Sequence, residues 1–300
     1  MPEIHAEYPR VTRVNPLSAR NLISTPVPRS KRRLNEVRRY VLVITTCVSV
    51  LASCTARTGP VAPDGTRVSE SEYDLGRDAW MRHGDARGGL SHALRAVDLD
   101  DDNADAHHLV ALIYLDLCQL PGRENCKLEE AKQHAEKALR LRADYREARN
   151  TLGVVLLHLK RPSDAVAVLK PLTTDILYTT PENAWGNLGL AYLESNQLDE
   201  AVAALQRSVA AQPRFCVGFY RLGLALERKG MMESAVEAYS SALEADPRCA
   251  SLQDAYLGRA RTLLRLGRKV PANADIEVCV GLTKDSHSGK ECDSLRQNLK

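Results

Sequence analysis

Apolar residues recur every three or four positions along residues 70–275, which is the spacing of one face of an amphipathic helix. Three stretches share a Leu-Gly pair followed by three apolar residues: 149–156, 185–192 and 219–226. An alanine follows each stretch nine residues later: Ala165, Ala201 and Ala235. The pattern predicts pairs of helices, the first containing the Leu-Gly pair and the second containing the alanine.

Small residues in both helices of a pair favour close packing. The glycines on the first helix are Gly153, Gly189 and Gly223. The leucines that precede them should fill the core of each pair: Leu152, Leu188 and Leu222. Pro213 and Pro247 are expected to end second helices. Because one helical pair cannot bury its own apolar face, neighbouring pairs must stack.

The spacing of 34 to 36 residues between these stretches resembles the tetratricopeptide repeat (TPR), a helix–turn–helix unit. The resemblance implies an all-α fold, a right-handed superhelical solenoid of about six units over residues 70–275. The first and last units are degenerate, and the last begins near Leu257-Gly258. The second unit carries an insertion at residues 116–127, and residues 276–300 are expected to form a C-terminal cap.

A basic run at residues 29–39 precedes a largely apolar stretch that ends at Cys54, the order found in secretory signals. Residues 51–54, Leu-Ala-Ser-Cys, resemble the bacterial lipobox. The resemblance implies that residues 1–53 are removed and that Cys54 carries a diacylglycerol, the only cofactor-like group expected. Residues 54–69 would then be the lipidated cysteine and a flexible tether. The alternative is a buried strand or short helix that ends in a cysteine.

Charge is distributed unevenly along the chain. Residues 1–53 contain nine basic and three acidic side chains. Because the whole chain has a net charge of +3, the remaining residues are net acidic. Only 5% of the residues are aromatic. An acidic body with few aromatic residues lacks the features of a nucleic-acid-binding surface, and we exclude nucleic acid as the main partner. The residues directly after Cys54 are Thr55 and Ala56, and no Asp stands next to it. By resemblance to other lipoproteins this implies an outer-membrane anchor with the body in the periplasm.

Six cysteines remain beyond Cys54: Cys118, Cys126, Cys216, Cys249, Cys279 and Cys292. An even number in an exported protein favours disulfides. Cys118 and Cys126 flank the insertion, where Pro121-Gly122 can reverse the chain, and Cys279 and Cys292 are the next pair by proximity. Cys216 and Cys249 lie about one repeat apart, so either a bridge or two buried thiols fits. No Cys-x-x-Cys spacing is present, so no zinc site is expected.

No group of residues has the spacing of a catalytic site. The glycines of residues 84–89 do not match a phosphate-binding loop. His107 and His108 are adjacent and would point about 100° apart on a helix, and we expect both to be partly exposed. The acidic run 98–105 falls at a turn between repeats, where a solvated turn is favoured over a calcium site. We therefore expect no enzyme activity, no metal and no small-molecule substrate.

In TPR proteins a few positions of each first helix line the concave face. Here the candidates for a partner-binding groove are His108, Leu112, Asn150, Val154, Leu157, Leu190, Leu193, Tyr220 and Leu224. Lysine is absent from this set, which disfavours a carboxylate clamp. An apolar strip facing water would suit an amphipathic helix or another hydrophobic segment. The alternative is that these leucines pack against neighbouring helices.

A lipidated, exported chain of six TPR units with paired cysteines resembles one family, the TPR pilotins of type IV pili (the Tgl, PilF and PilW type). The resemblance implies a non-enzymatic outer-membrane lipoprotein that promotes insertion and multimerisation of the pilus secretin. Its partners would be secretin subunits. A general periplasmic TPR scaffold for envelope or polysaccharide assembly is the alternative.

Overall fold

Helices follow one another along the whole of the computed structural model, which describes residues 64–118 and 126–299. The expected leader, Cys54 and most of the expected tether lie outside these described residues. Within them the α-helices are α2 (Asp64–Met81), α3 (Ala86–Leu99), α4 (Ala104–Leu117), α5 (Leu128–Leu141), α6 (Arg146–His158), α7 (Pro162–Leu169), α8 (Pro181–Glu194), α9 (Leu198–Ala211), α10 (Cys216–Arg228), α11 (Met232–Glu244), α12 (Gln253–Arg265), α13 (Lys269–Leu282) and α14 (His287–Asn298). Two short 3₁₀ helices, η2 (Lys170–Thr174) and η3 (Pro247–Ser251), follow α7 and α11.

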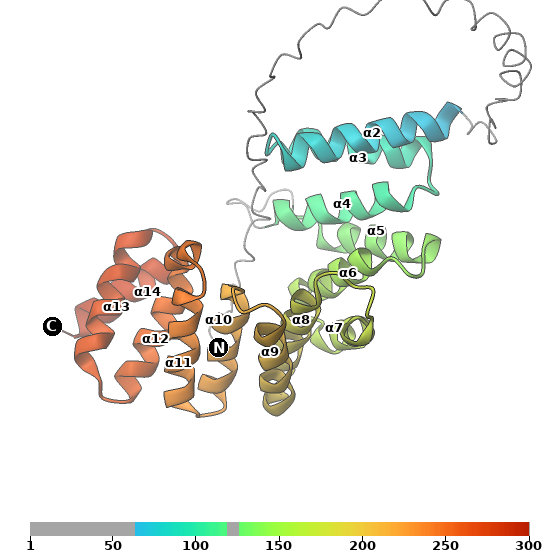
Figure 1. Ribbon diagram of the computed structural model, residues 1–300. Coiled ribbons are helices and arrows are strands. Elements are labelled where there is room, and N and C mark those ends of the chain that lie inside the picture. Colours follow the sequence, from blue (N-terminus) through green and yellow to red (C-terminus); the bar gives the residue numbers. More distant parts are fainter. Residues whose placement is uncertain (1–63, 119–125, 300) are drawn as a thin grey trace, which may run out of the picture.

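The helices form six antiparallel pairs, from α2–α3 to α12–α13, and α14 packs against the last pair (Figure 1). This arrangement confirms the predicted all-α TPR solenoid of about six units. Three boundaries differ from the prediction. Helix α2 begins at Asp64, inside the expected tether, α13 extends to Leu282, and the sixth unit begins at Gln253 rather than near Leu257.

Stacking of the pairs curves the array. Each first helix contacts the first helix of the next pair: α4 contacts α6, α6 contacts α8, α8 contacts α10 and α10 contacts α12. Among the described residues, successive second helices make no comparable contact. The first helices therefore line the inner side of the curve and the second helices the outer side (Figure 1).

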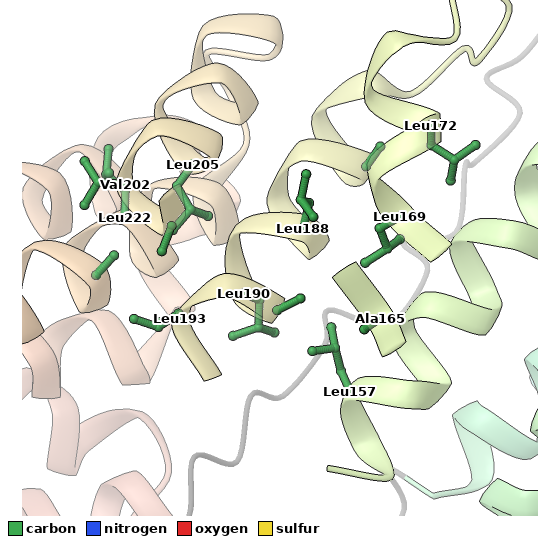
Figure 2. Packing of buried hydrophobic residues seen from close by; sticks show 14 of the residues in the cluster. Leu157, Ala165, Leu169, Leu172, Leu188, Leu190, Leu193, Val202, Leu205 and Leu222 are labelled. Atoms are coloured by element: carbon green, nitrogen blue, oxygen red, sulfur yellow. The ribbon is translucent and has the colours of Figure 1, made fainter. Parts of the chain in front are cut away.

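Close approach within a pair depends on the glycines of the first helix. A Cβ added at Gly189 would lie 2.5 Å from Cγ of Leu205, and one at Gly223 would lie 2.6 Å from the Tyr239 ring. A Cβ added at Gly153 would likewise overlap the side chain of Leu169. The leucines that precede these glycines are buried, as predicted, and form one continuous core with the side chains of the second helices (Figure 2).

The turn inside most pairs uses one residue in the left-handed backbone region. Gly84, Gly230 and Gly267 adopt φ values of 68°, 84° and 72° at this place, where glycine carries no steric cost. Lys160 and Asn196 adopt φ values of 58° at the corresponding turns of the third and fourth pairs. Asparagine tolerates this conformation better than lysine does, so the turn at Lys160 is the more strained of the two.

The glycine packing generates a stability prediction. Gly189→Ala should destabilise the protein by about 1–3 kcal/mol, because the new methyl group overlaps Leu205 in the core. Gly281→Ala in α13 is the matched control, since no atom lies within 4 Å of its added Cβ. It should raise stability by about 0.5–1 kcal/mol through helix propensity. Urea unfolding of both variants measures the difference, and equal midpoints would contradict the packing argument.

Candidate partner-binding surface

Most of the residues expected to form an apolar concave strip are buried in the structure. Relative exposure is 6% for Val154, 2% for Leu157, 1% for Leu190 and 0% for Leu193. Leu157, Leu190 and Leu193 lie between successive first helices (Figure 2). The prediction that they face water is wrong, because neighbouring first helices approach one another on the inner side of the curve and cover these positions. They belong to the core.

Four expected members of the surface remain partly exposed. Leu112 lies on α4, Asn150 on α6, and Tyr220 and Leu224 on α10. Between α4 and α10 the inner side therefore presents few apolar side chains. The surface consists of apolar residues at two separate places with polar residues between them, and it is not a continuous apolar groove.

A row of polar side chains crosses the middle of this inner side. The Asn187 side chain on α8 donates a hydrogen bond to Oδ1 of Asn150 on α6, with a distance of 3.0 Å. Arg221 on α10 donates to Oδ1 of Asn187, also over 3.0 Å. Asn187 and Arg221 are 6% and 2% exposed, so their hydrogen bonds link three successive first helices where water is largely excluded.

Neither Asn187 nor Arg221 was among the residues predicted for the surface. Arg221 stands one position after the predicted Tyr220, and Asn187 stands at the corresponding place of the preceding repeat, where no residue was predicted. The signal that could have found them is their shared register. Thr151, Asn187 and Arg221 each lie two residues before the glycine that contacts the second helix. Polar residues at the same place in three successive repeats indicate a contact between neighbouring repeats.

His108 continues the polar contacts toward α4, and it is buried at 8% exposure rather than partly exposed as predicted. Its Nε2 lies 2.9 Å from Oγ1 of Thr151, and its Nδ1 lies 2.9 Å from the Tyr145 hydroxyl. Burial lowers the pKa of His108 to about 4. The ring is therefore neutral near pH 7 and acts as a hydrogen-bonding group between repeats.

Asp105 and Arg142 lie beside His108 and are more accessible. The Asp105 carboxylate accepts hydrogen bonds from Arg142 over 2.6 Å and from the Tyr145 hydroxyl over 2.8 Å. Burial alone would raise the pKa of Asp105, but these hydrogen bonds outweigh it and lower the pKa. Burial and the hydrogen bond to Asp105 raise the pKa of Tyr145. Asp105 and Arg142 therefore form an ion pair at one end of the inner side, and their opposite charges cancel.

A second carboxylate belongs to Glu194, the last residue of α8. Burial raises its pKa, while the positive charges of Lys160, Arg228 and Arg221 act in the opposite direction. The backbone carbonyl of the preceding residue, Leu193, accepts a hydrogen bond from Arg228 over 3.1 Å. This part of the inner side therefore combines a half-buried carboxylate with basic side chains.

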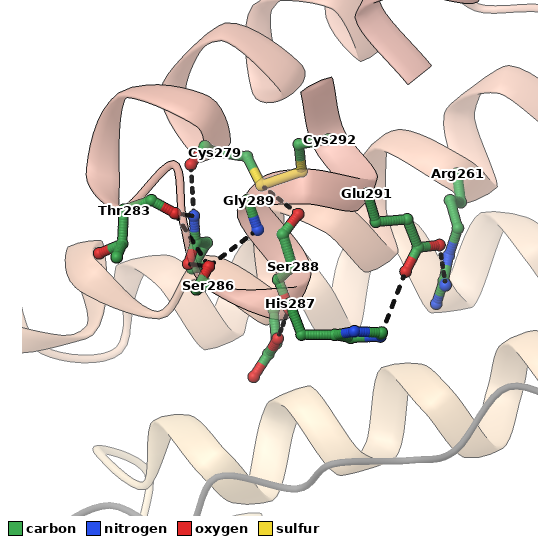
Figure 3. Close-up of a disulfide and its surroundings, with 11 residues drawn as sticks. Arg261, Cys279, Thr283, Ser286, His287, Ser288, Gly289, Glu291 and Cys292 are labelled. Atoms are coloured by element: carbon green, nitrogen blue, oxygen red, sulfur yellow. Dashed lines mark hydrogen bonds and ion pairs between the residues drawn. A yellow bond between two sulfur atoms is a disulfide. The ribbon is translucent and has the colours of Figure 1, made fainter. Parts of the chain in front are cut away.

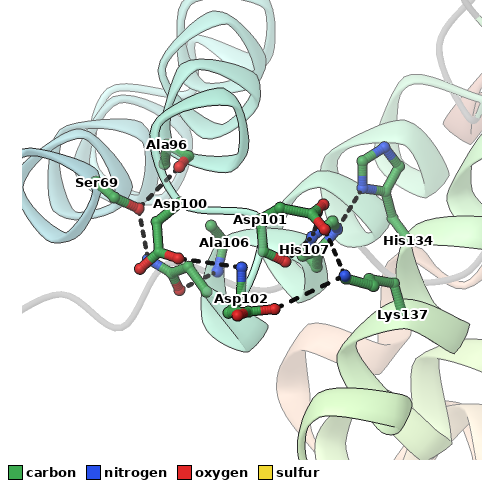
Figure 4. Close-up of polar contacts among 10 residues, drawn as sticks. Ser69, Ala96, Asp100, Asp101, Asp102, Ala106, His107, His134 and Lys137 are labelled. Atoms are coloured by element: carbon green, nitrogen blue, oxygen red, sulfur yellow. Dashed lines mark hydrogen bonds and ion pairs between the residues drawn. The ribbon is translucent and has the colours of Figure 1, made fainter. Parts of the chain in front are cut away.

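The acidic run 98–105 forms a capped turn between the first two pairs (Figure 4). Asn103 caps α4 by accepting from the Ala106 backbone N–H, and its amide donates to Ser69 over 2.9 Å. His107 is 4% exposed, against the prediction of partial exposure, and contacts His134 at 2.9 Å between the two Nδ1 atoms. Within residues 64–118 and 126–299 no group of His, Cys, Asp or Glu could hold a metal ion.

The structure brings the six cysteines together as three disulfides. The Cα atoms of Cys118 and Cys126 are 4.3 Å apart, and those of Cys279 and Cys292 are 6.2 Å apart. Cys279–Cys292 joins α13 to α14 (Figure 3). The sequence allowed either a bridge or two free thiols at Cys216 and Cys249. In the structure they form a disulfide between the start of α10 and η3, with their Cα atoms 5.8 Å apart. This distance lies within the range that a bridge requires.

Comparison with known proteins agrees with this architecture. A family model described as tetratricopeptide repeat matches residues 124–171 and 187–250. The crystal structure of PilW, a type IV pilus biogenesis factor, is 24% identical, with a TM-score of 0.63 covering 75% of this chain and 98% of PilW. PilF of Pseudomonas aeruginosa is 17% identical, with a TM-score of 0.60 covering 78% of this chain and 100% of PilF. The chain therefore has the TPR fold.

Curated relatives match over shorter shares of their length. Superkiller complex protein 3 of Mus musculus is 27% identical over 184 residues, which is 60% of this chain and 11% of the relative. Protein O-mannosyl-transferase TMTC3 of Homo sapiens is 26% identical over 128 residues, 42% of this chain and 14% of the relative. This chain thus spans about a tenth of the length of these relatives. In the described part of the chain, no helix has the length and apolarity needed to cross a membrane.

Some apolar residues of the inner side are buried and others are partly exposed, and substitution by glutamate should affect the stability of the two classes differently. Leu190→Glu should destabilise the protein by more than about 3 kcal/mol, because it places a carboxylate in the core. Leu224→Glu should cost much less, because Leu224 is partly exposed. Thermal melting of both variants measures the difference. Similar losses would show that Leu224 is also a core residue.

The buried histidine predicts a dependence of stability on pH. The unfolded chain binds a proton at His108 with a pKa near 6.5, whereas the folded chain does so only near pH 4. The free energy of unfolding should therefore fall by on the order of 3 kcal/mol as the pH drops from about 6.5 to 4. Urea unfolding across this range should show a shallower dependence in His108→Gln. An identical slope would contradict the burial of a neutral ring.

Proposed function

We propose that this protein is a non-enzymatic outer-membrane lipoprotein that acts as a pilotin, an assembly factor for the type IV pilus secretin. The observation that carries the proposal is the extent of the structural likeness. The structural match covers 98% of PilW and 100% of PilF, so both structures lie almost wholly within the fold of this chain. Both identities are below 25%, so the pilus role is our inference from the shared architecture and the lipobox-like sequence.

In the proposed mechanism, Cys54 carries the lipid and holds the solenoid at the membrane, with the body in the periplasm. The inner side of the array then contacts an amphipathic segment of a secretin subunit. Its apolar residues would meet Leu112 at one place and Tyr220 and Leu224 at the other. The polar row through Asn150 would meet its polar residues. Anchoring raises the local concentration of this surface near the membrane, and no covalent chemistry is required of the protein.

The cysteines support an exported protein. Disulfides persist in oxidising compartments such as the periplasm and are rare in the cytosol. Three pairs within bridging distance account for all six cysteines of residues 118–292. The same observation supports the alternative function, a periplasmic scaffold for envelope assembly. An experiment that measures the secretin is therefore needed to distinguish the two functions.

The decisive variant is Cys54→Ala. It should abolish acylation, shift the protein from the membrane fraction to the soluble fraction, and reduce the amount of SDS-resistant secretin multimers. Cys47→Ala, a cysteine seven residues earlier, is the matched control and should leave both unchanged. Membrane fractionation and immunoblotting of the secretin measure the two effects.

The outcomes separate the proposals. Loss of anchoring together with loss of secretin multimers supports the pilotin. Loss of anchoring with normal multimers and normal twitching would contradict the pilotin and favour the scaffold. Unchanged membrane association in Cys54→Ala would contradict the lipid anchor.

A further inference from the structure

Helix α13 is apolar on two opposite faces. One face is buried against α12 and α14 and includes Ile276 and Cys279, both 0% exposed. The other face carries an outer stripe at every fourth position, which we define as Val270, Ala274, Val278 and Leu282. Exposure is 85% for Val270, 43% for Val278 and 38% for Leu282. An apolar stripe along a whole exposed helix is unusual on a soluble solenoid and calls for a partner.

At two of these four places, those of Val270 and Val278, the second helices α5, α9 and α11 carry polar residues. The second helices can be aligned on a buried alanine that each carries at the same repeat position. This alanine is Ala272 in α13, and in the preceding pairs it is Ala131, Ala165, Ala201 and Ala235. Counted from that alanine, Val270 corresponds to Glu129, Ser163, Asp199 and Glu233. In α5, α9 and α11, Val278 corresponds to Lys137, Arg207 and Ser241. Compared with these helices, Val270 and Val278 are therefore specific to α13, whereas the places of Ala274 and Leu282 are also apolar in α9, at Ala203 and Ala211.

Neighbouring helices contact α13 on its other sides. Asp275 accepts two hydrogen bonds from Arg259 of α12, over 2.8 and 2.7 Å. Glu277 accepts from Arg296 of α14 over 3.4 Å. These contacts fix α12 on one flank and α14 on the other. Within the described residues, the outer stripe is left facing solvent.

We propose that the outer stripe docks against the same stripe of a second copy of this chain, with the two α13 helices antiparallel. A two-fold axis near Ile276 pairs Val270 with Leu282 of the second copy and Ala274 with Val278. A small side chain then faces a larger one on both sides of the axis, as close helix packing requires. Gly281, beside the stripe, has no atom within 4 Å of an added Cβ and allows the two backbones to approach.

Charge at the two ends of the stripe favours the same arrangement. Lys269 opens α13 and Asp285 follows its end, and both are exposed. Neither forms an ion pair with another described residue. In the antiparallel arrangement Lys269 of each chain meets Asp285 of the other, so the pair is made twice. One helix from each chain buries little area, which predicts a weak dimer in dynamic equilibrium with the monomer.

Sedimentation velocity of the full chain in mild detergent tests the proposal over a wide range of protein concentration. The chain should dimerise reversibly, and Val278→Glu should weaken dimerisation at least about tenfold by placing a carboxylate in the contact. Ser241→Glu is the matched control, because it introduces the same side chain at the same register on α11. Thermal melting of both variants should match that of the unmodified chain, which separates loss of contact from loss of fold.

Charge reversal tests the geometry. Lys269→Glu and Asp285→Lys should each weaken the dimer, and the double variant should restore it, because the reversed pair is again complementary across the axis. Failure of the double variant to restore the dimer would overturn the antiparallel arrangement. A chain that stays monomeric at every concentration but sediments with vesicles of anionic lipid would overturn the proposal and assign the stripe to a membrane surface. The test does not depend on the secretin, so its failure leaves the pilotin proposal untouched.

Discussion

The contact between a glycine on each central first helix and a large side chain on its second helix is the constraint on which the solenoid depends. Gly153, Gly189 and Gly223 receive Leu169, Leu205 and Tyr239 so closely that no Cβ could be accommodated without displacement. This contact sets how near the two helices of a pair lie. Since the three central pairs share it, they stack at similar angles, and a regular curvature accumulates from α6 to α11.

Curvature in turn decides which residues can meet a partner. It brings successive first helices together on the inner side, so Leu157, Leu190 and Leu193 become core. Burial of this side also removes water from any polar group there, so each such group requires a hydrogen-bond partner in the protein. The hydrogen bonds from Arg221 to Asn187 and from Asn187 to Asn150 meet that requirement, and they restrict how far neighbouring repeats can slide. The inner side is thus rigid at its centre, and its accessible apolar residues lie on either side of the polar row.

The sequence predicted what repeats locally. The Leu-Gly pairs, the following alanines and the 34-residue spacing were enough to predict the fold, the number of units and the buried Leu152, Leu188 and Leu222. Exposure of the inner residues could not be predicted, because it depends on the distance between neighbouring first helices, which no single repeat encodes. The register of the sixth unit failed for a related reason. Gly258 resembles the other glycines in sequence, but its added Cβ would meet Tyr239 of the preceding pair, within 2.6 Å.

The ends of a solenoid follow different rules from its middle, because a terminal pair lacks one neighbour. At the C-terminal end, α14 takes the place of the next first helix. The Cys279–Cys292 disulfide holds it there, together with the hydrogen bond that its N-cap residue Ser286 donates to Oε1 of Gln253. That cap covers the face of α13 that a seventh pair would have covered. Where α13 carries Val270 and Val278, the second helices α5, α9 and α11 carry polar residues, which need no cover. Apolar residues at this place therefore reflect a requirement beyond completion of the array, and a contact outside the chain is the physical reason that fits.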